Sequence, residues 1–279
     1  MSTPLADFHA RPMRIDFSSD IPRLWNGGDA FATHYMNALS LLFPSGEKFF
    51  IDAVRAYRER IEDPQLASQV RAFIGQEGWH RSVHADYNAW LESFGLPASE
   101  LDARSARKIA LIKGKLPPRG WLAATVCLEH FTAIMARDLL SDPSLTAGMH
   151  PSMRQLWTWH ALEELEHKAV AFDVYKAIGG KYSTRVKAML FVSANFAIDT
   201  LRNLFALLRA EGKLWSPGLW WRGLGFLFGR TPGVFWRTLP GWIAFFRPGF
   251  HPWDDDDRAL IARADQGSSL AVPSGPEPD

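Results

Sequence analysis

The chain has 279 residues, 47% of them apolar and 22% charged, so it can bury a sizeable core and is not globally disordered. Thirty-one basic and 30 acidic side chains leave a net charge of +1, which gives no global basic field and makes nucleic acid a poor partner. The single cysteine, Cys127, excludes an internal disulfide framework and a cysteine-rich metal site. Any metal ion must therefore be held by histidines and carboxylates.

Capping and turn signals divide the chain into helices, and no stretch shows the period-two alternation of a strand. Asp29 and the pair Asp63-Pro64 are typical helix starts, whereas Pro44-Ser45-Gly46 predicts an interruption. The expected helices cover residues 30–42, 47–62, 64–93, 99–113, 118–140, 151–178 and 183–210. The sequence therefore predicts an all-α protein.

The composition changes beyond the last of these helices. Tryptophan, phenylalanine and arginine alternate with glycine and proline over residues 213–253. This pattern fits helices packed on the bundle or on a second subunit, a peripheral membrane contact, or a lid over a substrate. We divide the chain into an N-terminal extension (1–28), a helical bundle (29–212), an aromatic-rich helical segment (213–264) and a disordered tail (265–279).

The N-terminal residues show no apolar core behind a basic start, so we expect no signal peptide. No window of about 20 residues is apolar enough for a membrane span. We therefore expect a cytoplasmic protein, with peripheral contact through 213–253 to the inner face of the membrane as an alternative to full solubility. A homodimer in which this segment packs on the second subunit is another expectation.

Two Glu-x-x-His motifs lie in the middle of long predicted helices, Glu77 with His80 and Glu164 with His167. Residues three apart lie on one face of a helix about one turn apart, so both side chains of a motif can reach one metal ion. Charged groups at the centre of a helix are costly to bury without a partner. The motifs therefore predict metal ligands.

Two further glutamates complete a pattern of four helices. Glu47 lies 30 residues before Glu77, and Glu129 lies 35 residues before Glu164, distances that fit antiparallel neighbours. The longer gap between Glu77 and Glu129 holds an additional helix, as a long crossover requires. A four-helix bundle with one crossover that directs Glu, Glu-x-x-His, Glu and Glu-x-x-His inward is the arrangement of ferritin-like dinuclear carboxylate proteins. The predicted break before Glu47 makes its ligation the weakest part of this pattern.

Other polar residues share these helix faces. We expect His160, four residues before Glu164, to be an additional metal ligand. We expect Gln76, His84 and Glu163 to hydrogen bond to the ligands and fix the orientation of their imidazole rings. The sequence assigns no catalytic residue.

At these residues the chain resembles the ferritin-like superfamily, and more closely the bacterial family of predicted metal-dependent hydrolases. The matching stretches include Phe43–Glu47, Gln76–His80 with His84, and Trp159–Lys168. The resemblance implies a ferritin-like bundle and a metal-dependent enzyme. The ligand pattern also resembles di-iron carboxylate oxygenases, and His160 is similar to an additional histidine in di-iron arylamine N-oxygenases.

Three functions are consistent with this pattern. The first is an oxidase or oxygenase with two iron ions that acts on a hydrophobic small molecule. The second is a hydrolase that uses a metal-bound hydroxide, and the third is a non-enzymatic iron-binding or membrane-associated protein. Carboxylate and imidazole ligands without thiolates favour two iron ions, with manganese or zinc as alternatives.

Overall fold

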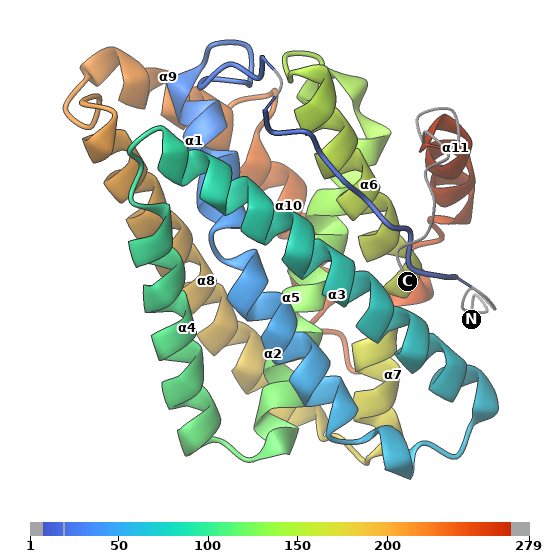
Figure 1. The fold of residues 1–279 in the computed structure, drawn as a ribbon. Helices are drawn as coiled ribbons and strands as arrows, with labels where there is room; N and C mark the ends of the chain where they lie inside the picture. Colours follow the sequence, from blue (N-terminus) through green and yellow to red (C-terminus); the bar gives the residue numbers. More distant parts are fainter. Residues whose placement is uncertain (1–7, 19, 269–279) are drawn as a thin grey trace.

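The computed structural model describes residues 8–18 and 20–268 (Figure 1). Within these residues the chain forms eleven α-helices and no β-strand, which confirms the all-α prediction. The helices are α1 (Ala30–Ser40), α2 (Phe43–Arg55), α3 (Pro64–Ser93), α4 (Ala98–Lys115), α5 (Pro118–Ser141), α6 (Pro151–His167), α7 (Val170–Ala177), α8 (Tyr182–Ala210), α9 (Pro217–Phe228), α10 (Val234–Ala244) and α11 (Arg258–Ser268).

Capping residues fix several of the predicted helix starts. The Asp29 side chain accepts a hydrogen bond from the backbone amide of Ala32 at the start of α1. Asp63 accepts one from Gln65 at the start of α3, where Pro64 is the first helical residue. Each aspartate satisfies a backbone amide that has no partner within its helix. Both starts agree with the sequence prediction.

The predicted interruption at Pro44-Ser45-Gly46 is displaced, because the chain turns at Leu41 and Leu42 instead. Helix α2 begins at Phe43 and includes Pro44 in its first turn, where proline fits because it leaves no backbone hydrogen bond unmade. Glu47 is therefore the fifth residue of a continuous helix, and the break before it lies at Leu41 and Leu42, ahead of that helix. The helix also ends earlier than predicted, at Arg55 instead of Glu62.

A second difference lies after the second Glu-x-x-His motif. The single helix predicted over residues 151–178 is divided into α6 and α7 by a turn at Lys168 and Ala169. The buried Lys168 ammonium group donates a hydrogen bond to Asp257 near the start of α11. The division thus coincides with a contact to a distant part of the chain.

Four helices form the central part of the molecule. Helix α2 packs against α3 and α5, and α5 packs against α6. Helix α4 connects α3 to α5 and packs on α2 and α3, in the place of the predicted crossover. Helix α8 lies beside α1 and α5 on the outside of this group (Figure 1).

The N-terminal extension is packed on the helices. Figure 1 shows residues 8–18 and 20–28 crossing the face formed by α3 and α6. Met13, Ile21 and Trp25 are buried in the core, and the Trp25 carbonyl accepts a hydrogen bond from the amide of His150. The extension therefore covers one side of the central helices.

The aromatic-rich segment also packs on the bundle. Helix α9 contacts α1, α10 contacts α5, and α11 contacts α6. No helix in the described part of the chain combines the length and apolar character that a membrane crossing needs. Helix α11 extends through Ser268, past the predicted start of the tail at Asp265, and residues 269–279 of that predicted tail lie outside the described residues.

Candidate metal centre

The six residues predicted from the two motifs and two single glutamates come together between four helices. None of their side chains is more than 3% exposed. Helix α2 supplies Glu47, α3 supplies Glu77 and His80, α5 supplies Glu129, and α6 supplies Glu164 and His167. We call this set the centre.

One half of the centre surrounds His167. Its Nε2 atom lies 3.2 Å from Glu77 Oε1, 3.4 Å from Glu129 Oε2 and 3.6 Å from Glu164 Oε2. Three carboxylates from three different helices therefore face one imidazole nitrogen. Glu77, Glu164 and His167 have ligand atoms close enough to share one ion.

The other half surrounds His80. Its Nδ1 atom lies 3.5 Å from Glu164 Oε1 and 3.9 Å from Glu77 Oε1. Glu47, Glu77 and His80 also have ligand atoms close enough to hold one ion. Glu77 and Glu164 therefore lie between the two histidines and belong to both halves.

The polar atoms of the centre lack the partners that buried groups normally have. Nine buried atoms have no hydrogen-bond partner among the described residues: both carboxylate oxygens of Glu47, Glu77 and Glu129, Oε2 of Glu164, Nδ1 of His80 and Nε2 of His167. Such atoms cost roughly 1–3 kcal/mol each when they are left unpaired. Every one of the six residues contributes at least one, and a metal ion would satisfy them together. The donor set therefore fits a metal site.

The charges of the centre support the same conclusion. Among the described residues, no lysine or arginine forms an ion pair with the four glutamates. Burial, together with the nearby Glu77, raises the pKa of Glu129 to about 8. Burial and the Glu77 carboxylate also raise the pKa of Glu47 well above its usual value. Without a cation Glu47 and Glu129 are costly to ionise, and a bound cation would remove that cost, whereas the adjacent His167 already lowers the pKa of Glu164.

Gln76 and Glu163 contact the two histidines of the centre, as predicted. Glu163 Oε2 lies 3.0 Å from His80 Nε2, and Gln76 Oε1 lies 2.9 Å from His167 Nδ1. In each ring the nitrogen opposite this contact is the one that faces the centre. These contacts hold the rings in the orientation needed for ligation.

Two further residues of this network, Arg11 and Glu166, were not predicted. Arg11 forms two hydrogen bonds of 2.7 Å with the Glu166 carboxylate, and its backbone amide donates to Glu163. Gln76 Nε2 donates to Glu166 Oε2 at 2.8 Å. Glu166 lies within the Glu164-x-x-His167 motif, which is a signal visible in the sequence, whereas Arg11 lies in the N-terminal extension, outside the predicted bundle.

His160 and His84 form a second network at the edge of the centre. His160 Nε2 lies 2.9 Å from Glu164 Oε1, and its Nδ1 lies 2.7 Å from His84 Nε2. His84 Nδ1 contacts the Ser40 hydroxyl at 2.9 Å. Both nitrogens of His160 thus have partners, unlike His80 and His167, and ligation by His160 requires its Glu164 contact to be replaced by the ion.

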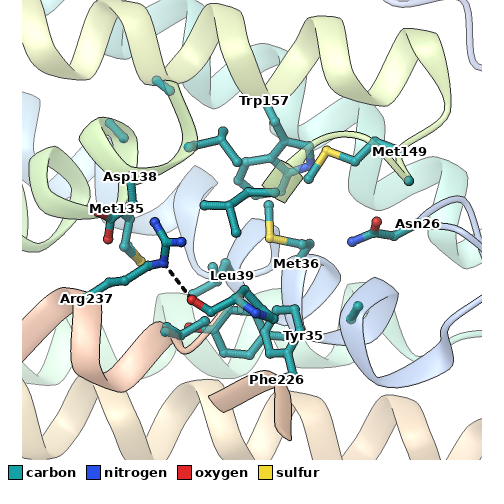
Figure 2. Close-up of a pocket in the computed structure, with 18 of the residues that line it drawn as sticks. Asn26, Tyr35, Met36, Leu39, Met135, Asp138, Met149, Trp157, Phe226 and Arg237 are labelled. Carbon is teal, nitrogen blue, oxygen red and sulfur yellow. Dashed lines mark hydrogen bonds between the residues drawn. The ribbon is translucent and has the colours of Figure 1, made fainter. Parts of the chain in front are cut away.

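A first cavity of about 380 Å³ reaches the centre from between α1, α5, α6 and α10 (Figure 2). Its walls are largely apolar, with Met36, Leu39, Met135 and Trp157 facing the space. Arg237 lies at its side and donates a hydrogen bond to the Pro232 carbonyl. The cavity extends to His160 and Glu164.

A second cavity of about 540 Å³ reaches the same two residues from between α2, α4, α5 and α8. It also extends to Glu47. Phe43 and Thr132 line both cavities, so the two spaces approach each other beside Glu164. Cavities of this size are typical of sites that bind small molecules.

The fold and the site define a helical protein with a buried carboxylate–histidine centre. The sequence matches the family described as predicted metal-dependent hydrolase over residues 9–256, and the chain belongs to this family. It is therefore a metal-dependent enzyme. Comparison with curated proteins and with solved structures gave no significant match.

Proposed function

We propose that the protein is a metal-dependent hydrolase with a dinuclear centre that cleaves an ester, amide or phosphoester bond in a hydrophobic small molecule. The observation that carries this proposal is the convergence of nine unpartnered, buried ligand atoms from six residues. Membership of the predicted hydrolase family supports hydrolysis over other metal chemistry.

The geometry supports two ions with shared ligands. His167, Glu129, Glu77 and Glu164 would hold one ion, and His80 and Glu47 with the same two glutamates would hold the other. Four carboxylates would balance the charge of two divalent ions. Oxygen and imidazole ligands without thiolates suit iron or manganese, with zinc as the third candidate.

Bound ions of this kind lower the pKa of a water molecule and polarise a carbonyl or phosphoryl oxygen. Hydrolysis then adds the oxygen of water to the carbonyl carbon or phosphorus and breaks the bond to the leaving group, which takes up a proton. The chain would position the substrate, because Phe43 and Thr132 line both cavities beside His160 and Glu164. A scissile bond held there would have its two parts in different cavities.

A second candidate is oxidation of the substrate by dioxygen at two iron ions. Two observations favour it: the donor set is rich in carboxylates contributed by four helices, and the second cavity is lined mainly by apolar side chains. Such a cavity keeps bulk water from reactive species. The same ligands serve both functions, so the reaction must be measured.

The test loads the purified protein anaerobically with iron, manganese or zinc. Metal content, oxygen uptake and cleavage of a panel of acyl nitrophenyl esters are then measured on the same samples. We expect about two ions per chain and ester cleavage without oxygen uptake. Iron-dependent oxygen uptake without cleavage would support the second candidate and reject hydrolysis.

A double variant and a matched control decide whether the centre is responsible. Glu77→Gln with Glu164→Gln keeps the side-chain shape but removes both bridging charges, so we expect metal binding and cleavage to be lost. Glu62→Gln changes an exposed glutamate just before α3 and should leave both unchanged. If the double variant binds as much metal as the native protein, the proposed centre is wrong.

A further inference from the structure

The two ends of the second cavity differ in chemical character. One end is the centre, and the other carries positively charged side chains. We propose that the substrate is an anionic amphiphile, with an acidic group at one end of a long apolar chain, and that it enters between α4 and α8. This inference rests on the proposed function for its reaction but not for its binding.

The walls of the second cavity suit an apolar chain. They are formed mainly by aliphatic and aromatic side chains from four helices, among them Phe50, Ile109, Ile112, Leu128, Val192 and Phe196. The cavity of about 540 Å³ reaches Glu47, His160 and Glu164 of the bundle interior. An apolar chain that fills this space would bring one of its atoms to the centre.

Two of the three lysines that line the cavity mark its outer end. Lys108, Lys115 and Lys187 line the cavity, and the last two are also exposed, so they lie where the cavity meets solvent. Lys115 and Lys187 form no ion pair with any described residue, whereas Lys108 is paired with Asp199. The opening therefore carries two cationic groups without a counter-charge, which complements an acidic group on a ligand.

Exposed apolar side chains surround the same opening. Leu116 and Phe191 line the cavity and are nevertheless 40% and 58% exposed. Such large apolar side chains at the edge of a pocket would be buried favourably against the first carbons of a ligand's alkyl chain. The combination of an apolar edge, two unpaired lysines and an apolar interior matches a molecule with one charged end.

The relative sizes of the two contributions set the expected result. Burial of each methylene group improves affinity about fourfold, whereas an exposed ion pair contributes about two- to fivefold. Chain length should therefore determine how tightly a ligand binds, and the lysines should determine which end remains outside. A neutral analogue of equal length should bind about tenfold more weakly than the acid.

The test is calorimetric titration of the full-length chain, both metal-free and metal-loaded, with octanoate, dodecanoate, dodecyl phosphate and dodecanol below their aggregation limits. We expect one molecule per chain, and dodecanoate should bind far more tightly than octanoate. Dodecanoate should also bind more tightly than dodecanol. Comparison of dodecanoate with dodecyl phosphate shows whether a carboxylate or a phosphate is preferred.

Variants locate the binding site. Lys115→Glu with Lys187→Glu should weaken dodecanoate binding about tenfold and leave dodecanol binding unchanged. Ala188→Trp, which places a large ring in the cavity wall, should abolish binding of both, with folding checked by circular dichroism. Lys213→Glu reverses a charge outside both cavities and should have no effect.

Two results would overturn the proposal. Equal affinity for dodecanoate and dodecanol would show that the acidic group does not contribute to binding. Unchanged binding in Ala188→Trp would show that the ligand does not occupy the second cavity. Because binding is measured without turnover, these results are separate from failure of the proposed hydrolysis, which would appear as absent metal or absent ester cleavage.

Discussion

At the scale of single residues, the centre depends on groups that hold the ligands in place. Gln76 joins His167 to Glu166, and Glu166 in turn is bound by Arg11. This chain of contacts leaves His167 with its Nε2 atom directed at the carboxylates. Orientation of a ligand by such partners usually changes metal affinity by about 10- to 100-fold.

We therefore predict that Gln76→Ala lowers metal affinity roughly 10- to 100-fold without unfolding the protein. The measurement is competition against a chelator of known affinity, for the native chain and the variant. Gln65→Ala, at an exposed position in the first turn of the same helix, is the matched control. Equal affinities for the native protein and Gln76→Ala would show that His167 does not need this contact.

The ligands were easier to predict than their supporting residues. Glu77, His80, Glu164 and His167 follow a local spacing that places two groups on one helix face, and this spacing is visible in the sequence. Arg11 reaches α6 only because residues 8–18 lie against it, a contact between positions more than 150 residues apart. No local pattern contains that information.

At the scale of elements, the packing of α9 on α1 depends on a glycine. A Cβ atom added at Gly223 would lie 2.3 Å from the ring of Phe31, which is buried. Gly225, two residues further along the same helix, has no atom near its Cβ position. The two glycines therefore separate a packing effect from a helix-propensity effect.

We predict that Gly223→Ala destabilises the protein by about 1–3 kcal/mol, because the added methyl group forces α9 away from α1. Gly225→Ala should be neutral or stabilising by up to about 1 kcal/mol, since alanine favours the helix. Urea unfolding followed by circular dichroism measures both. A Gly223→Ala variant as stable as Gly225→Ala would contradict the close packing.

Element boundaries show where prediction from sequence fails. The starts at Asp29 and Asp63 are fixed by local capping and were predicted correctly. Proline and glycine near Glu47 suggested a break, but proline in a first turn is compatible with a helix. The turn at Lys168 has neither glycine nor proline nearby, and its contact with Asp257 is set by tertiary packing.

At the scale of the whole molecule, the aromatic-rich segment leaves many large side chains uncovered. Trp215, Trp221 and Trp236 are 88%, 79% and 55% exposed. Sequence composition predicted this segment and three roles for it: packing on the bundle or on a second subunit, contact with a membrane surface, or a lid over a substrate. The described contacts of α9 and α10 with the bundle account for part of the segment but not for these three side chains.

We predict that these tryptophans contact the surface of an anionic membrane, because indole rings favour the membrane–water interface. Replacing all three with glutamine should lower the fraction of protein that sediments with phosphatidylserine-containing vesicles about tenfold. Leu111→Gln with Leu190→Gln changes exposed apolar residues outside this segment and serves as the control. If the triple variant instead converts a dimer to a monomer in sedimentation analysis, the segment is a subunit interface.

Every residue of the centre precedes position 168, but the end of α6 is secured from much further along the chain. Lys168 donates hydrogen bonds to Asp257 Oδ2 and to the carbonyl of Asp255, and its ammonium group lies 4.0 Å above the ring of Trp253. During synthesis, the ligands leave the ribosome well before the residues that secure the last of their helices. A nascent chain arrested at residue 250 would thus hold all six ligand residues yet lack these contacts, and firm retention of metal would await translation of residues 253–257.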